Sequence, residues 1–504
     1  SEAAKVMKIT AEDLKELGVI EQVIDGSLNT ISSANKAFED MVLGPDGKIY
    51  IAEIDYNSST MSGKLYSYTY SADTPTVPDT ELTIYSLEDN SSIRQAVAMF
   101  QKKYPDIYVN IEAGMSGDDS VTDTDALKVL NTEIMAGTGP DVLLLDGISE
   151  DTYIERGMLE NLSGVLKDED ILPNIKDAYT KEDGSIYTMP VKFGIPMIEG
   201  NKDIIAGITD LTTEADAAES QKDSYGKLKF FSSFSISPSG MIQGTIDNST
   251  PAWMNEDGTL KEDALKEYLE QVNRIWQTQK DAIEETKKAY QMGDDWANSD
   301  RSGYTNIAGS ITDLLVKVNT VAAGGLLSPE GLVYLDSAKK VDPDLDYRLL
   351  NGQSENCFYP RSIVGISAKA SEKEAAEKFV KFLFEEESQR ASNDEGLAVN
   401  SKVYEDMAYW KMGKSSGDTI GSIETSYDTG DGNIKQLEMD EIIPEDEAIQ
   451  NIMDLGKTLT VPAKSNQIIR NAVTESGEKY LNGETGLDDA VKEIMQEVNL
   501  YLSE

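Results

Sequence analysis

The stretch from Leu130 to Gly147, LNTEIMAGTGPDVLLLDG, constrains the fold more than any other part of the chain. Its first half has apolar residues at helical spacing, and Gly137 suits the left-handed conformation that often ends a helix. Pro140 then opens an uninterrupted apolar run, Val142 to Leu145, typical of a strand buried on both faces of a parallel sheet. A helix that leads directly into such a strand predicts an α/β fold.

The same stretch contains a G-x-G pair, Gly137 and Gly139, which raises the question of a phosphate-binding loop. In dinucleotide-binding units the glycine-rich loop follows a strand and precedes a helix. Here the order is reversed, and no GK[ST] motif follows. We therefore interpret the pair as a helix end followed by a strand start.

Strand-like and helix-like segments alternate around this stretch. Strands are expected over Leu82–Leu87 and Ile107–Gly114. The helix between them has one apolar face, made of Ile93, Ala96, Val97 and Phe100. The next helix is expected from Asp125 to Ala136, with its inward residues being Leu127, Val129, Leu130, Ile134 and Met135.

Later segments continue the alternation. Ser185–Ile205 predicts two strands with a crossing between them, and Ile363–Ile366 predicts a further strand. Ser371 and Glu374 predict a capping box at the next helix. Three further helices each have an apolar face, made of Leu265, Leu269, Val272 and Trp276; of Ala376, Phe379, Val380 and Leu383; and of Leu487, Val491, Ile494, Met495, Val498 and Leu502.

Composition excludes several classes of function. The 504 residues include 45 basic and 91 acidic ones, for a net charge of −46, which argues against nucleic acid or anionic membranes as partners. The chain has no histidine, so Ser-His-Asp and Cys-His catalysis are excluded. The single cysteine, Cys357, is expected to be a small buried apolar residue. No apolar run is long enough to span a bilayer, and we expect that any signal peptide has been removed.

Residues 1–80 differ from the rest. Two strands are expected around the Pro45-Asp46-Gly47 turn, one of them Lys48–Ile54 and the other within GKLYSYTYS. The pair resembles one blade of a β-propeller, and a lone hairpin is only marginally stable. The segment therefore either packs on the main body or belongs to a larger N-terminal domain. Ser71–Thr80 is expected to be a polar linker.

From about Glu81 to Glu504 the order of motifs resembles the extracellular solute-binding proteins of ABC importers, a broad family that includes the maltose-binding proteins. The motifs that carry the resemblance are FQKKYPDIYVNI, LNTEIMAGTGPDVLLLD, YIERGMLENLS, SIYTMPVKF, VGISAKASEKEAAEKFVKFLFEEESQ, EGLAVN and YLNGETGLDDAVKEIMQEVNLYL. Residues 1–80 fall outside it.

The resemblance implies a two-lobed, periplasmic-binding-protein-like α/β fold with a ligand cleft between the lobes, plus a short β-rich N-terminal extension. We expect residues 81–190 and 362–440 in the first lobe, and 191–361 and 441–504 in the second. It also implies an exported protein, usually lipid-anchored outside the cytoplasmic membrane in Gram-positive bacteria or else free in a periplasm. We expect a monomer that passes a sugar, or else a peptide or other polar metabolite, to an ABC permease. This chain has no lipobox cysteine, so its anchor stays open.

Two loops are candidates for the cleft because ligands of open α/β sheets bind beyond the carboxyl ends of the strands. Glu88, Asp89 and Asn90 follow one strand, and Asp146-Gly147 follow another. The alternative role of the first three is to cap the next helix, and that of Asp146 is to form a turn.

Further candidates rest partly on the resemblance, which places Lys192 and Phe193 where the chain first crosses between lobes, and Gly324 and Gly325 at the cleft. The alternative for Lys192 and Phe193 is a hinge strand, and the alternative for Gly324 and Gly325 is a plain turn. Trp253 either stacks on a sugar or covers the core of the second lobe. Before the strand that re-enters the first lobe, three residues can reach the cleft or hinge: Phe358, Tyr359 and Arg361.

We expect no cofactor and no metal. The WMNEDGTLKEDA segment fails as a calcium loop because its first and twelfth positions are Trp253 and Ala264. Three functions remain: a binding receptor, a glycosidase with paired carboxylates, and an adhesion or scaffold role of the N-terminal extension. The receptor needs no covalent chemistry, which suits a chain without histidine.

Overall fold

The computed structural model describes residues 36–55, 62–69, 80–115, 121–232, 236–255, 259–290, 306–391, 395–428, 433–463 and 466–503. Most of the linker expected at Ser71–Thr80 lies outside the described residues. The chain divides into two compact units. The first contains the described residues up to Leu82 together with Arg94–Asn110, and the second contains Thr83–Ile93 and the chain from Ile111 onward.

The first unit contains an antiparallel sheet of three strands, in the order β1-β2-β3, where two strands were expected. Its strands are β1 (Lys36–Leu43), β2 (Ile49–Asp55) and β3 (Ser62–Tyr68). The predicted turn joins β1 to β2, where the Gly44 amide donates to the Lys48 carbonyl at 2.7 Å. The unit also holds most of α3 (Ser91–Lys103) and β5 (Ile107–Ala113).

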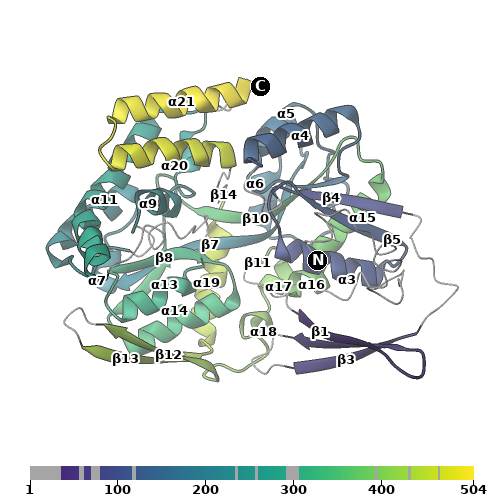
Figure 1. The fold of residues 1–504 in the computed structure, drawn as a ribbon, viewed down its shortest axis with the longest axis horizontal. Coiled ribbons are helices and arrows are strands. Elements are labelled where there is room, and N and C mark those ends of the chain that lie inside the picture. The colour runs from purple at the N-terminus through teal and green to yellow at the C-terminus, as the bar shows by residue number, and fades with distance from the viewer. Residues whose placement is uncertain are drawn as a thin grey trace, which may run out of the picture. The chain divides into compact units, whose positions relative to one another are not determined.

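The second unit is organised around one long strand, β7 (Met189–Asn201) (Figure 1). Its first half pairs with β10 (Cys357–Ile366) and β11 (Leu397–Ala398). Its second half pairs with β8 (Val321–Leu326) and β9 (Leu345–Leu349). The sequence predicted two strands over Ser185–Ile205. That prediction is wrong, because a single strand passes through both lobes and α7 (Lys202–Ile205) follows it.

The first lobe continues the sheet from β10 to β6 (Val142–Leu144) and β4 (Thr80–Ser86). β4 and β6 are parallel, while β10 runs antiparallel to β6. Its helices are α4 (Asp123–Ala136), α5 (Glu150–Glu155), α6 (Pro173–Tyr179), α15 (Lys373–Leu383), α16 (Glu386–Arg390), α17 (Ser401–Tyr404) and α18 (Met407–Trp410).

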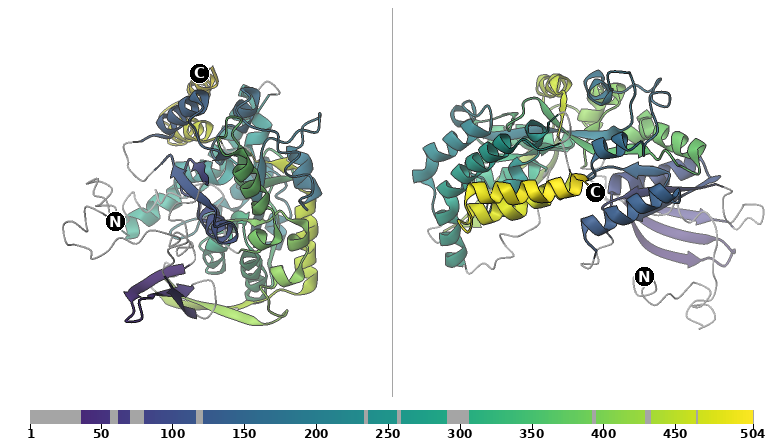
Figure 2. Two further views of the ribbon diagram at one scale, coloured as in Figure 1. Left: turned by 90° about the vertical axis from the view of Figure 1, so that its right-hand side faces the viewer. Right: turned by 90° about the horizontal axis from the view of Figure 1, so that it is seen from above.

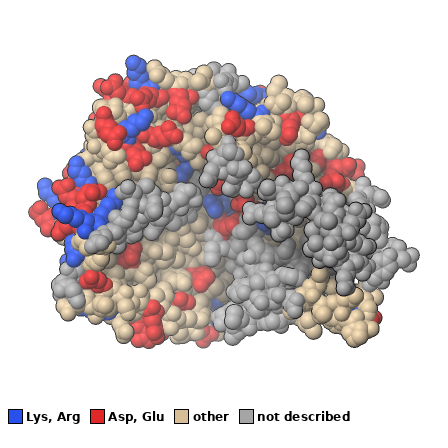
Figure 3. Space-filling view, viewed as in Figure 1, with Lys and Arg blue, Asp and Glu red and all other residues tan. Residues whose placement is uncertain are grey.

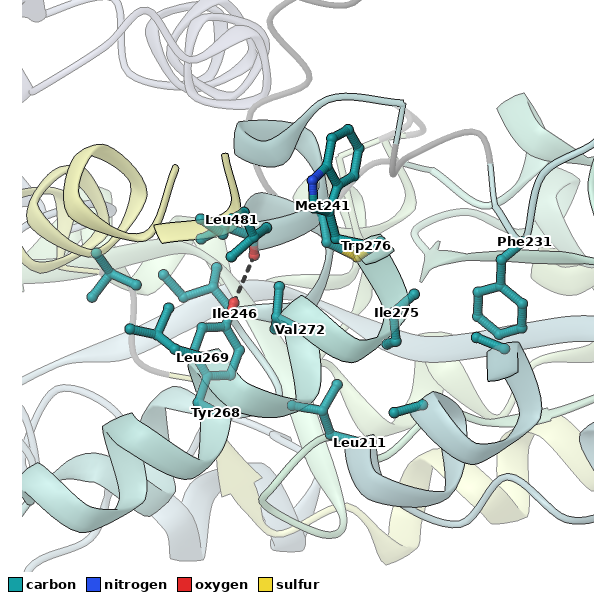
Figure 4. Packing of buried hydrophobic residues seen from close by; sticks show 14 of the residues in the cluster. Leu211, Phe231, Met241, Ile246, Tyr268, Leu269, Val272, Ile275, Trp276 and Leu481 are labelled. Atoms are coloured by element: carbon teal, nitrogen blue, oxygen red, sulfur yellow. Dashed lines mark hydrogen bonds between the residues drawn. The ribbon is translucent and has the colours of Figure 1, made fainter. Parts of the chain in front are cut away.

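The second lobe contains an apolar core to which most of its helices, though not α13 and α14, contribute side chains (Figure 4). Leu265, Leu269, Val272 and Trp276 lie in this core as predicted, and Tyr268 donates to the Ile242 carbonyl at 2.9 Å (Figure 4). The helices are α8 (Leu211–Gln221), α9 (Pro238–Thr245), α10 (Thr250–Trp253), α11 (Glu262–Tyr290), α13 (Ala308–Leu315), α14 (Pro329–Val341), α20 (Gln467–Leu481) and α21 (Leu487–Ser503). A short 3₁₀ turn, η2 (Lys222–Ser224), follows α8.

The C-terminal part of the chain returns through both lobes. The hairpin of β12 (Thr419–Asp428) and β13 (Ile434–Ile442) packs on α14. After α19 (Asp446–Thr458), the short β14 (Val461–Pro462) pairs with Cys357 and Phe358 of β10. The chain then enters α20 and α21, which lie side by side in Figure 2.

Several local predictions are confirmed and two are wrong. Gly137 ends α4 in the left-handed conformation, with a φ of 76°. Val129 and Met135, which were expected to face inward, are 58% and 67% exposed, because Ala126, Leu127, Leu130 and Ile134 alone cover the buried face of α4. Ser371 forms no capping box, because its amide and hydroxyl donate to Asp141 instead.

None of the helices in the described part of the chain is both long enough and apolar enough to cross a bilayer.

Asp141 joins β4 to the start of α15, and we expect Asp141→Ala to destabilise the first lobe. Its buried carboxylate accepts from the amides of Thr83, Ser371 and Glu372 at 2.7–3.0 Å. Leaving these donors unpaired should lower the free energy of unfolding by roughly 3 kcal/mol. Urea unfolding checks this, with the exposed Asp177→Ala as control. Equal stability of both variants would contradict the prediction.

Candidate functional site

A cavity of about 360 Å³ lies in the second unit, where loops of the first lobe meet helices of the second. The loops that follow β4 and β6 form one wall, α9 and α20 form the other, and β10 passes between them. The lining residues are Ser86, Leu87, Glu88, Asp89, Asn90, Leu144, Asp146, Gly147, Gln243, Arg361, Ser362, Glu395, Gln467, Arg470, Asn471, Thr474 and Glu475. Almost all of them are polar.

The loop after β4 is held by Asn90. Its side-chain oxygen accepts from the Ile93 amide at 2.9 Å, and thereby caps α3. Its amide nitrogen donates to the Ser362 hydroxyl at 3.0 Å. Asn90 therefore has the predicted capping role and also lines the cavity. Glu88 and Asp89 beside it are exposed at the cavity.

The loop after β6 is fixed by Asp146. Its two carboxylate oxygens accept from the Ser362 and Ile363 amides, each at 2.9 Å. Burial raises the pKa of the Asp146 carboxyl, and the nearby charge of Arg361 opposes that rise. Ser362 has a φ of 52°, a left-handed conformation that is costly for a residue with a β-carbon. The Asp146 bonds hold β10 in this conformation at the cavity.

The wall opposite is one face of α20. Gln467, Arg470, Asn471, Thr474 and Glu475 repeat at helical spacing along it. The other face packs into the core of the second lobe through Ile469, Ala472 and Val473.

Two hydrogen bonds join α20 to the first lobe. The Gln467 amide donates to the Gly147 carbonyl at 2.8 Å. The Asn471 side-chain amide donates to the Asp123 carboxylate at 2.9 Å. The cavity is therefore closed on this side by contacts between the lobes.

A buried ion pair supports α20 from behind. Arg470 and Asp247 are 8% and 4% exposed, and the Arg470 guanidinium donates to the Asp247 carboxylate. Burial raises the pKa of Asp247, and the charges of Arg470 and Arg361 oppose the rise. The Arg361 Nε donates to the Glu395 carbonyl at 3.0 Å. The two guanidinium groups therefore have partners within the protein.

Ser86 is the one fully buried hydroxyl of the cavity lining with no hydrogen-bond partner among the described residues. It is 4% exposed and stands at the end of β4. Buried hydroxyls are normally hydrogen-bonded, so a polar group in the cavity would satisfy it.

Six of the residues proposed from the sequence line this cavity: Glu88, Asp89, Asn90, Asp146, Gly147 and Arg361. The proposed aromatic residues do not. Trp253, Phe193 and Phe358 are completely buried and Tyr359 is 4% exposed. Trp253 donates through Nε1 to Gln353 at 2.6 Å, within the second lobe, and Phe193 contacts Phe358 edge to face. In this structure these side chains have no surface for stacking on a solute.

Lys192, Gly324 and Gly325 also lie outside the lining. Lys192 is 4% exposed and donates to the Gln389 carbonyl at 2.6 Å. Gly325 pairs with Pro196 of β7, and a β-carbon there would lie 2.9 Å from Leu327. The absence of a side chain at Gly325 therefore allows close packing against Leu327. Whether any of the thirteen proposed residues contacts a solute stays a prediction.

Sequence reasoning missed the α20 wall, Gln243, Ser86, Ser362 and Glu395. A signal was present in α20. Its polar face is made of two amides, a hydroxyl, one arginine and one glutamate, whereas a solvated face usually has mostly lysine and glutamate. Gln243 and Glu395 had no such pattern, because only the folding of distant segments brings them to the cavity.

The arrangement can hold a polar solute by hydrogen bonds from both lobes. Carboxylates and carboxamides accept and donate in fixed planes, which suits hydroxyl groups. No group of three or more potential metal-ligating side chains occurs within the described ranges. The lining residues that the structure describes include no aromatic side chain.

Comparisons with known proteins identify the family. The model of the bacterial extracellular solute-binding proteins matches residues 86–390. No curated protein matches the chain. Several hundred solved chains do, and three of them are described next.

Maltose-bound MalE3 from T. maritima is 17% identical over 84% of this chain and 100% of its own, with a TM-score of 0.47. An ABC substrate-binding protein from Listeria monocytogenes in complex with cycloalternan is 18% identical over 84% and 99%, with a TM-score of 0.46. A sugar transporter from Bacillus licheniformis in complex with stachyose is 13% identical over 83% and 99%, with a TM-score of 0.47. We draw no conclusion about this chain's ligand from these distant likenesses.

We expect the stability contributed by Lys192 to rise with pH. Burial lowers its pKa from 10.5 to about 7, so between pH 7 and 10 the unfolded chain binds more protons than the folded one. The free energy of unfolding of the wild type, minus that of Lys192→Met, should increase by up to about 1.4 kcal/mol per pH unit in this range. Urea unfolding at several pH values measures it. The exposed Lys128→Met should show no such slope, and a flat Lys192 difference would contradict the assignment.

We expect Arg470→Met to destabilise the protein by about 3–5 kcal/mol, because it leaves the Asp247 carboxylate buried without a partner. Removing both charges in Arg470→Met/Asp247→Leu should recover much of that loss. Urea unfolding of the two variants decides the point. If the double variant is as unstable as the single one, the ion pair is not the cause.

Proposed function

Because the chain belongs to the family of bacterial extracellular solute-binding proteins, we propose that it captures a small polar solute in its cleft and delivers it to the permease of an ABC importer. The observation that carries the proposal is the cavity whose walls come from both lobes. A solute held by both walls binds the closed arrangement better than an open one, and this difference in affinity drives closure.

Three crossing segments can serve as the hinge. They are β7, β10 and the segment that contains β14, and β10 pairs with each of the other two through backbone hydrogen bonds. The predicted lobe boundaries at residues 190/191 and 361/362 fall within β7 and β10. We propose these two boundaries as the positions about which the two lobes move against each other.

A sugar is the solute that the lining favours. The polar groups of Gln243, Asn471 and Thr474 come from the second lobe, and those of Glu88 and Asn90 from the first. The volume lies near the lower end of the ~300–1,000 Å³ typical of small-molecule sites, which favours a small sugar over a long chain. The buried aromatic residues make recognition by hydrogen bonding the basis of the proposal, rather than stacking. A peptide or another polar metabolite is the alternative.

We further propose that the protein works as a monomer outside the cytoplasmic membrane, held by a lipid anchor, and that it catalyses no reaction. Binding and release require only hydrogen bonds to the solute, and no step needs a general base.

A panel of sugars, amino acids and short peptides tests this function. We expect thermal shift and calorimetry to find a stabilising solute, and small-angle scattering to show compaction when it is added. Gln243→Ala should weaken binding about tenfold, because one lost hydrogen bond to a bound ligand costs about 1.4 kcal/mol.

Gln436→Ala on the exposed strand β13 is the matched control and should bind as the wild type does. Absence of binding to every solute in the panel would contradict the proposed function. Equal weakening by both variants would show that the cavity is not the site.

A further inference from the structure

The charges that line the cavity are unequal. Five carboxylates line it, those of Glu88, Asp89, Asp146, Glu395 and Glu475. Two guanidinium groups line it, those of Arg361 and Arg470, and no lysine of the described residues does. Cavities with one predominant sign of charge concentrate that sign's field, because their walls have a low dielectric constant.

The two guanidinium groups are already engaged. Arg470 forms its ion pair with Asp247, and both residues are more than nine-tenths buried. Arg361 donates to the Glu395 carbonyl, and its charge acts on the carboxyls of both Asp146 and Asp247. An anionic solute that bound either arginine would compete with buried carboxylates, and a buried carboxylate that loses its partner is strongly destabilising.

The carboxylates differ in how much they are engaged. Asp146 uses both oxygens for backbone amides of β10, and Glu395 accepts from the Ser92 amide at 3.4 Å. The side-chain carboxylates of Glu88 and Glu475 accept no hydrogen bond and form no ion pair within the described part of the chain. Both are exposed at the cavity, Glu88 from the first lobe and Glu475 from α20 of the second. A bound solute therefore meets an uncompensated negative charge from each wall.

We infer that this cleft selects neutral or cationic solutes and rejects anionic ones, with Glu88 and Glu475 as the residues that determine this selectivity. The inference rests on the proposed receptor function and narrows its ligand class. Neutral sugars and amino sugars fit, because hydroxyl and ammonium groups donate to carboxylates. Uronic acids and sugar phosphates do not fit, because their charge meets Glu88 and Glu475 and finds no unengaged arginine.

The field of the whole protein acts in the same direction. The net charge is −46, and acidic side chains are spread over the face drawn in Figure 3. Salt screens this general field within about 8–10 Å at ordinary ionic strength. Charges that lie next to the bound solute are screened less than the distant charges of the general field, so the two contributions can be separated by experiment.

Matched sugars test the inference on the whole chain. The probes are galactose, galactosamine and galacturonic acid; glucose, glucosamine and glucose 6-phosphate; and xylo-oligosaccharides with and without glucuronic acid substituents. Calorimetry and thermal shift are run in 20 mM and 300 mM salt. Within any set that binds, we expect the anionic member to bind at least tenfold more weakly than the neutral one.

The double variant Glu88→Gln/Glu475→Gln should reduce this discrimination at least fivefold. The control Glu374→Gln/Glu438→Gln changes the net charge equally, at exposed positions on α15 and β13 away from the cavity, and should keep the discrimination. Higher salt should affect the control and the wild type alike. Thermal melts of both variants verify that they fold.

The outcomes separate this inference from the proposed function. An anionic sugar that binds the wild type as tightly as its neutral partner overturns the inference and leaves the receptor function standing. Discrimination lost equally in both double variants assigns it to the general field and overturns the role of Glu88 and Glu475. No binding by any probe to the folded wild type contradicts the receptor function, and the inference with it.

Discussion

The hydrogen-bond ladder along β7 is the constraint on which the rest of the second unit depends. Its first half belongs to the first lobe and its second half to the second, so one strand connects both sheets. In this position the strand buries two ionisable side chains, and burying them in their charged forms is unfavourable. It buries both Lys192 and Glu199. The Glu199 carboxylate has no hydrogen-bond partner among the described residues, and burial raises its pKa well above the ordinary value. Both residues are easier to bury in their neutral forms.

The position of the cavity follows from the strand pairing along β7. Because β10 is paired with β7 on one side and β6 on the other, Arg361 and Ser362 are held between the lobes. Asp146 fixes the backbone of Ser362, and Asn90 fixes its hydroxyl. The second lobe contributes a helix face that approaches from the other side. The site is therefore made of polar side chains from two loops, a strand and two helices, an arrangement that can hold a polar solute by hydrogen bonds.

The sequence predicted the helices and strands better than it predicted the tertiary contacts that their side chains make. The end of α4 at Gly137 follows from local backbone preference, and the buried face of α11 follows from its period, so both are confirmed. The predicted capping box at Ser371 failed because Asp141, which is distant in sequence, competes for the same amide. The sequence left two roles for Trp253, stacking on a sugar or covering the core of the second lobe, and the local sequence of a turn does not distinguish between them. Packing against Tyr268 decided that it is buried.

What the sequence determined by itself was the α/β class, the loops that end β4 and β6, and a strongly negative net charge. These properties depend on local period, backbone preference and composition, which a chain carries into any fold. Only the tertiary structure decided that α20 faces those loops, that Arg361 and Arg470 have carboxylate or carbonyl partners, and that the proposed aromatic residues are buried. Those properties depend on contacts between segments hundreds of residues apart, which no local pattern records.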